Sequence, residues 1–155
     1  MSETPRPADA SRSVLAVLVS ALLGGLAGGM SWCFLALWLP WPTQFWIVPI
    51  AIGLAAFACW QDYRGRVAVA CTALAIGIAF IYAQYLFGAV RIADSMGLSL
   101  REALFKAGFN LTADIAWANL RTKDWVALAV ALLVGMGAAR VCARSHRTSG
   151  DGWKN

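Results

Sequence analysis

Residues able to carry chemistry are missing from the interiors of the four longest apolar segments of this sequence. Those segments cover residues 14–39, 44–60, 67–90 and 125–141, and no Asp, Glu, Lys, Arg or His lies inside them. Ionisable groups at membrane depth are costly and persist where transport or catalysis needs them. The sequence therefore predicts no proton or sodium relay, no catalytic residue and no enzyme activity.

Three cysteines and one histidine are the best candidates for metal ligands in this sequence. Cys59, Cys71 and Cys142 lie near segment ends that a four-span topology brings to one side, and His146 follows Cys142 by four positions. Thiolate and imidazole ligands suit zinc or copper. However, no pair has the spacing of a zinc motif, and cysteine is a common apolar filler. We expect packing roles, no metal and no cofactor, and leave open whether these four residues converge.

Three polar side chains stand together in the later part of the third segment. Tyr82 and Tyr85 share a helix face, and Gln84 lies between them. One interpretation is a contact with a lipid headgroup, a quinone or another ligand. The other is hydrogen bonding within the bundle at the membrane interface, where tyrosine is enriched. The second is the more common role, and the three residues are the ligand candidates that the sequence offers.

Closely spaced glycines are the clearest positive signal. Gly24 with Gly28, and Gly25 with Gly29, form two overlapping small-xxx-small pairs, which let helix backbones approach closely in lipid. The fourth segment offers a similar surface through Gly135 and its neighbour Ala139. These residues are predicted either to pack within the protein's own bundle, the favoured interpretation, or to contact a partner protein or a second copy.

Composition places the chain among membrane proteins. It has 155 residues, of which 60% are hydrophobic and 14% charged, against roughly 45–50% and 25% in a typical globular protein. The net charge of +5 arises from basic residues that stand singly or in pairs. Such spacing suits membrane orientation and predicts no nucleic-acid partner.

The expected fold is all-α: a polytopic membrane protein with a four-helix transmembrane bundle. Residues 13–143 would form this domain, between a disordered tail at 1–12 and a polar tail at 144–155. Pro40 and Pro42 predict a turn after the first span. Pro49 removes a backbone donor early in the second span, so an irregular first turn is expected near Phe45.

Residues 99–120 predict an amphipathic interfacial helix between the third and fourth spans. Ser99 and Glu102 have the spacing of a capping box, and Gly108 and Asn110 are candidates for a break. Apolar residues recur at three- and four-residue steps and predict one buried face: Leu100, Leu104, Ala107, Leu111, Ile115 and Ala118. Arg101, Glu102, Asp114 and Asp124 supply charge nearby and are expected to be solvated.

An even number of spans puts both termini on one side of the membrane. That side would hold eight basic residues in short segments, against five on the other, and basic residues favour the cytoplasm. We therefore expect cytoplasmic termini in a bacterial inner membrane.

The sequence supports three functional hypotheses. The leading one is a non-enzymatic accessory, assembly or partner-binding subunit, whose partners are the bilayer and either another membrane protein or a second copy. The second is a subunit of an oligomeric transporter or channel for a neutral or lipidic solute. The third and least favoured is a membrane enzyme that acts on lipid.

Overall fold

The computed structural model describes residues 7–39, 42–61, 63 and 66–149, and this part consists of helices and short connections without any strand. The order is α1 (Pro7–Trp38), the 3-10 helix η1 (Thr43–Trp46), α2 (Ile47–Trp60), α3 (Arg66–Met96), α4 (Leu100–Ala118) and α5 (Thr122–Ser149). The predicted all-α class is confirmed. Both ends of the described helical region extend beyond the predicted spans, since α1 begins at Pro7 and α5 continues to Ser149.

Among the described helices, three are long and apolar enough to cross a membrane. They contain the stretches Val14–Trp38, Arg66–Met96 and Thr122–Cys142. The apolar helical stretch Gln44–Trp60 is shorter. Together these helices indicate an integral membrane protein.

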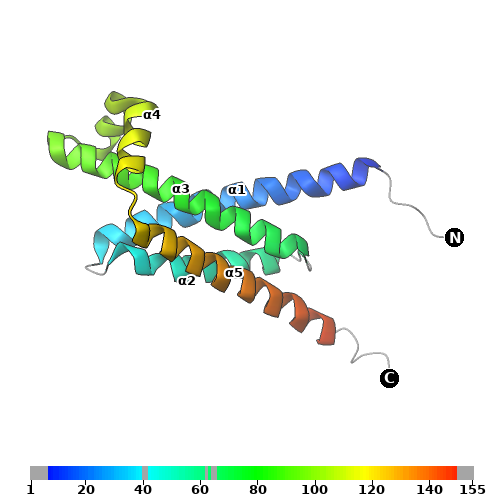
Figure 1. Ribbon diagram of the computed structural model, residues 1–155. Helices are drawn as coiled ribbons and strands as arrows, with labels where there is room; N and C mark the ends of the chain where they lie inside the picture. The colour runs from blue at the N-terminus through cyan, green and yellow to red at the C-terminus, as the bar shows by residue number, and fades with distance from the viewer. Residues whose placement is uncertain (1–6, 40–41, 62, 64–65, 150–155) are drawn as a thin grey trace, which may run out of the picture.

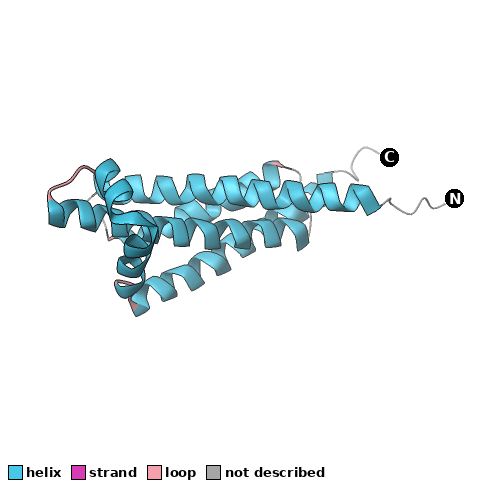
Figure 2. Ribbon diagram, turned by 90° about the horizontal axis from the view of Figure 1, so that it is seen from above, coloured by secondary structure: helices cyan, strands magenta, loops and turns pink. Residues whose placement is uncertain are grey.

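The helices α1, α2, α3 and α5 run lengthwise beside one another, and α4 lies across one end (Figures 1 and 2). The helical ends nearest the two termini lie at the opposite end from α4 (Figure 1). The helix α1 packs chiefly on α3, and α5 packs on α2 and α3. The helix α3 is therefore the central element, and it carries α4 at its far end.

Small side chains form the centre of the bundle. Fully or almost fully buried alanines line the contacts between the lengthwise helices: Ala21, Ala51, Ala75, Ala79, Ala83 and Ala131. Lipid tails are as apolar as leucine, so close packing rather than a hydrophobic drive must hold such helices together. Alanine and glycine allow that close approach.

The start of the second segment is irregular, as the sequence predicts. Residues Thr43–Trp46 form a 3-10 turn, and the regular α-helix begins only at Ile47. Pro49 has no backbone N–H to donate to the carbonyl of Phe45, so a regular α-helical first turn would lack one of its bonds. A tighter 3-10 turn accommodates that loss.

The end of α3 corrects the sequence prediction. The charged residues Arg91 and Asp94 predict that this helix ends with its apolar stretch, but α3 continues to Met96. It stops at Gly97, whose φ of 63° is left-handed, and the N–H of Leu98 donates to the carbonyl of Ala93 at 2.9 Å. This is a Schellman stop. The charged residues mark where the apolar stretch ends rather than where the helix ends.

The helix α4 has the predicted cap and a break. Ser99 Oγ accepts from the N–H of Glu102, and the Glu102 side chain accepts from the N–H of Ser99, which completes the capping box. Gly108 interrupts the helix with φ 71° and ψ 166°. Thr112 Oγ1 donates to the carbonyl of Gly108 at 2.9 Å. This hydrogen bond links the second half of α4 to the residue at which the helix is interrupted.

The buried face of α4 differs from the predicted one. Of the predicted face, Leu100, Leu111 and Ala118 are exposed and Ile115 is half-buried, and the side chains of Leu104 and Ala107 lie outside the described residues. Ala103, Thr112 and Ala116 are buried instead. The predicted face kept one helical register across Gly108, although Gly108 was itself a candidate for a break. Because Gly108 rotates the second half relative to the first, the apolar spacing no longer marks one continuous face.

Candidate functional site

The second half of α4 rests on the last turns of α3 through a close backbone approach. Gly88 lies against the carbonyl of Thr112, and a Cβ atom at Gly88 would also lie 3.4 Å from that of Ala116. Next to this contact, Ile115 packs on a small cluster formed by Ile92, Ala93 and Ala103. Only glycine at position 88 lets α4 lie this close. This contact between Gly88 and Thr112 thereby fixes the walls of two neighbouring cavities.

The first cavity is apolar and has a volume of about 470 Å³. It lies between α3 and the second half of α4, with Leu26 of α1 at its edge. All three ligand candidates of the third segment line it, namely Tyr82, Gln84 and Tyr85. The structure therefore brings these residues together, on the side that faces α4.

Aromatic rings make up much of the wall of the apolar cavity. The rings of Tyr85 and Phe109 stack with a centroid distance of 5.4 Å. Phe80 and Trp117 also line the cavity, and Trp117 is 62% exposed. Such a surface suits a hydrocarbon chain or a ring system, and it offers Gln84 as a polar contact.

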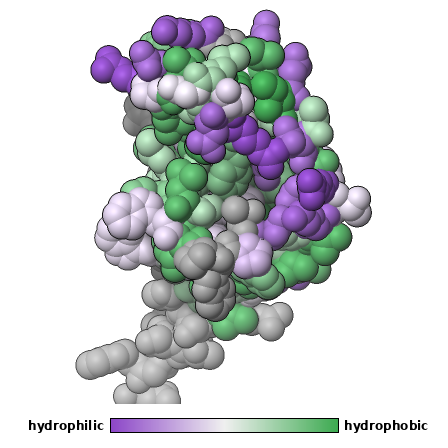
Figure 3. Space-filling view, turned by 90° about the vertical axis from the view of Figure 1, so that its left-hand side faces the viewer, coloured by the Kyte–Doolittle hydropathy of each residue, from purple (hydrophilic) through white to green (hydrophobic). Residues whose placement is uncertain are grey.

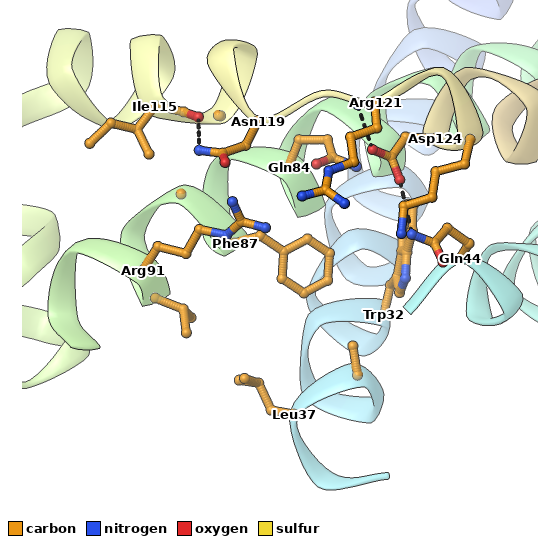
Figure 4. A pocket seen from close by; sticks show the side chains of 15 residues that line it. Trp32, Leu37, Gln44, Gln84, Phe87, Arg91, Ile115, Asn119, Arg121 and Asp124 are labelled. Carbon is orange, nitrogen blue, oxygen red and sulfur yellow. Dashed lines mark hydrogen bonds between the residues drawn. The ribbon is translucent and has the colours of Figure 1, made fainter. Parts of the chain in front are cut away.

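The second cavity has a volume of about 320 Å³ and a mixed lining, and we call it the polar cavity because its charged side chains distinguish it from the first. Figure 4 shows its labelled side chains, which come from α1, η1, α3, α4, the link between α4 and α5, and the start of α5. Three basic side chains line it, those of Arg91, Arg121 and Lys123, against the single carboxylate of Asp124. In the sequence these residues stand out only as flanking charge, so the site that they share was missed.

The two cavities adjoin. Gln84 and Ala116 line both of them. A molecule with an apolar part and an anionic part would find complementary surroundings for each part on either side of these two residues.

Hydrogen bonds hold the carboxylate of Asp124 in place. Its Oδ2 accepts from the backbone N–H of Arg121 at 2.9 Å, and its Oδ1 accepts from Nε2 of Gln44 at 3.3 Å (Figure 4). Within the described part of the chain, no carboxylate forms an ion pair with the side chains of Arg91, Arg121 or Lys123. The cavity therefore presents more positive than negative charge.

The glycine pairs of α1 separate into two groups. A Cβ atom at Gly25 would lie 2.8 Å from the carbonyl oxygen of Ala75, and one at Gly29 would lie 2.7 Å from that of Ala79. These two glycines therefore pack on α3 within the protein's own bundle. Gly24 and Gly28 instead face side chains of α2, where an added Cβ atom would lie 3.4 Å and 3.2 Å from the nearest atom, and they line an open groove between α1 and α2.

The small residues of α5 face the bundle. Gly135 lies against Ile76 and Ala51, and Ala139 is fully buried. They contact α2 and α3, not the glycine pairs of α1, for which the sequence suggested them as a matching surface.

The cysteines that the sequence offers as metal ligands do not all lie together. The thiols of Cys59 on α2 and Cys142 on α5 lie close enough to interact electrostatically. The thiol of Cys71 instead donates to the carbonyl of Val17 on α1 at 3.9 Å. The side chain of His146 lies outside the described residues. Over the part of the chain that is described, no group of three potential metal-ligating side chains forms.

The charged residues of α4 and of the first turn of α5 do not form one catalytic group. Glu102 caps its own helix and lies 4.0 Å from Lys106, whereas Asp124 belongs to the polar cavity. Arg101 and Asp114 are exposed on α4.

Comparisons with known proteins add no family: no protein-family model, no curated protein and no solved structure matches this chain.

Proposed function

We propose that this chain is a non-enzymatic, four-span membrane protein that binds a lipidic ligand between α3 and α4. The observation that carries the proposal is that the apolar and polar cavities are neighbours and share Gln84 and Ala116 in their linings. A lipid has the same division into a hydrocarbon part and a polar part. The proposal favours a lipid-binding subunit over the general accessory role, and it also fits a subunit that hands a lipidic solute to a larger complex.

The fourth span of this proposal is α2 with its preceding turn. The stretch Gln44–Trp60 is apolar after its first residues and matches the lower limit of roughly 17 residues for a span. It starts at the end of the molecule that carries α4 and returns to the end nearest the termini (Figure 1). Four crossings would place both termini on one side, in the cytoplasm of a bacterial cell by the positive-inside bias.

An interfacial position for α4 is supported by its surface. Phe105, Phe109 and Trp117 are strongly exposed on the same short helix as the exposed Arg101 and Lys106. Aromatic and basic side chains mixed on one element are typical of the membrane–water boundary. Seen from this end of the molecule, hydrophilic and hydrophobic side chains are interspersed (Figure 3).

The proposal is tested by measuring bound lipid. The protein would be extracted in a mild detergent, and lipid per chain would be counted by native mass spectrometry. Ala113→Phe narrows the apolar cavity, which Ala113 lines, and should reduce the bound lipid. Ala118→Phe, on the exposed end of the same helix, is the matched control. Wild-type lipid content in Ala113→Phe would contradict the proposal.

Association with another membrane protein or a second copy is a second candidate, favoured by the groove between α1 and α2. Gly24, Gly28 and Gly53 line this groove, and a Cβ atom at Gly53 would meet no atom within 4 Å. A larger side chain there fills the groove without disturbing the bundle. Gly53→Leu should therefore abolish crosslinking to a partner in native membranes. Gly137→Leu, at an exposed and equally open glycine of α5, should leave it unchanged. Unaltered crosslinking of Gly53→Leu would reject this groove as the contact.

A further inference from the structure

We infer that the ligand of the α3–α4 site is a lipid whose headgroup ends in a phosphate monoester, held by Arg91, Arg121 and Lys123. The inference rests on the proposed lipid site and specifies the headgroup that the site recognises.

The three basic residues belong to different parts of the chain. Arg91 lies on α3, Arg121 in the link between α4 and α5, and Lys123 in the first turn of α5. They line one cavity because α4 folds back on α3 and returns the chain to the same end of the bundle. Guanidinium groups pair with phosphate through two parallel hydrogen bonds, and lysine adds a point charge.

The net charge of the cavity favours a doubly charged anionic headgroup over a zwitterionic one. Three basic groups stand against the one carboxylate of Asp124, which two donors already engage. A phosphate monoester carries about −1.5 to −2 charges at pH 7, which balances this excess. A zwitterionic phosphodiester would place an ammonium group among the three cations, where like charges repel.

The position of the polar cavity suits the headgroup of a lipid whose acyl chain enters the bilayer. Arg91 lies just past the uncharged stretch of α3, whereas Tyr82 and Tyr85 lie inside it and line the apolar cavity. Gln84 lies at the junction and offers an amide to the linkage between head and chain. The arrangement therefore places phosphate near the membrane surface and hydrocarbon between α3 and α4.

The test titrates the purified full-length chain in detergent with dioleoyl phosphatidic acid and, separately, with dioleoyl phosphatidylcholine, by native mass spectrometry. Phosphatidic acid should bind at least about tenfold more tightly, because hydrogen bonds to charged groups contribute roughly 1.5–3 kcal/mol each. Arg91→Gln and Arg121→Gln should each remove most of this preference. Arg101→Gln and Lys106→Gln, at exposed basic residues of α4 outside the cavity, should keep it.

The outcomes separate the inference from the function on which it rests. Equal binding of the two lipids, reduced by Ala113→Phe, would overturn the phosphate assignment and leave the lipid site standing. No binding of either lipid would overturn both. A third arm adds inorganic phosphate as competitor: displacement at matched concentration would show that the site takes free phosphate and would overturn the lipid source. Resistance of the bound phosphatidic acid to displacement by inorganic phosphate supports a lipid as the source of the phosphate group.

Discussion

A Cβ atom on Gly88 of α3 would lie 2.8 Å from the carbonyl oxygen of Thr112 on α4. Real side chains essentially never come this close to a backbone oxygen, so the contact exists only because residue 88 is glycine. Through this contact α4 is held over Tyr82, Gln84 and Tyr85 rather than extending away from the bundle.

Replacing Gly88 should therefore release α4. We expect Gly88→Leu to push the second half of α4 off α3 and to reduce lipid binding, since overpacking of this kind costs about 1–3 kcal/mol. Limited proteolysis within residues 100–118 and lipid counting by native mass spectrometry measure the two effects. Gly77→Leu, at a glycine of the same helix with nothing within 4 Å, is the control. Equal protease resistance of both variants would show that the contact between Gly88 and Thr112 does not hold α4 on α3.

The two glycine pairs of α1 should differ in their tolerance of a methyl group. Gly25→Ala and Gly29→Ala meet backbone oxygens of α3 and should each destabilise the bundle by about 1–3 kcal/mol. Gly24→Ala meets side chains at ordinary contact distance, 3.4 Å or more, and should be nearly neutral. Thermal unfolding in detergent compares the three variants, and a similar melting temperature for all of them would contradict the packing of α1 on α3.

The cysteine pair reports the contact between α2 and α5. Oxidation with copper phenanthroline in membranes should link Cys59 to Cys142 within one chain, because their thiols lie close enough to interact. Cys71 faces α1 and should remain a free thiol, which makes Cys71→Ala the control that leaves the crosslink intact. Peptide mapping by mass spectrometry identifies the product. Failure to form the 59–142 link under conditions that oxidise both thiols would place α2 and α5 elsewhere.

Two buried threonines should respond in opposite ways to loss of the hydroxyl group. Thr72 Oγ1 has no hydrogen-bond partner among the described residues, so Thr72→Val should leave the melting temperature unchanged or raise it. Thr112 Oγ1 donates to Gly108, so Thr112→Val should loosen the break in α4 at a cost of about 0.5–1.5 kcal/mol. A larger loss for Thr72→Val than for Thr112→Val would contradict these hydrogen-bonding assignments.

Local features were the most predictable from the sequence. The capping box at Ser99, the break at Gly108 and the irregular turn before Ile47 depend on residues a few positions apart, and each is confirmed. The face of α4 was predicted incorrectly because the same glycine that breaks the helix also changes the register of the residues on its C-terminal side.

The candidate site was only half predictable. Tyr82, Gln84 and Tyr85 stood out as polar residues in an apolar segment, which identified one wall of the apolar cavity. The convergence of Arg91, Arg121 and Lys123 depends on where α4 turns back, and the contacts that decide this, such as that between Gly88 and Thr112, join residues far apart in the chain. No spacing within the sequence encodes such a contact.

Mapping the position of a bound lipid in the membrane tests the central claim most directly. The protein would be irradiated in native membranes that contain phosphatidic acid with a photoreactive acyl chain, and the labelled peptides would be identified by mass spectrometry. Labelling concentrated in residues 78–85 and 109–117, and reduced in Ala113→Phe, is the predicted result. Labelling confined to the outer faces of α1 and α5 would contradict a lipid site between α3 and α4.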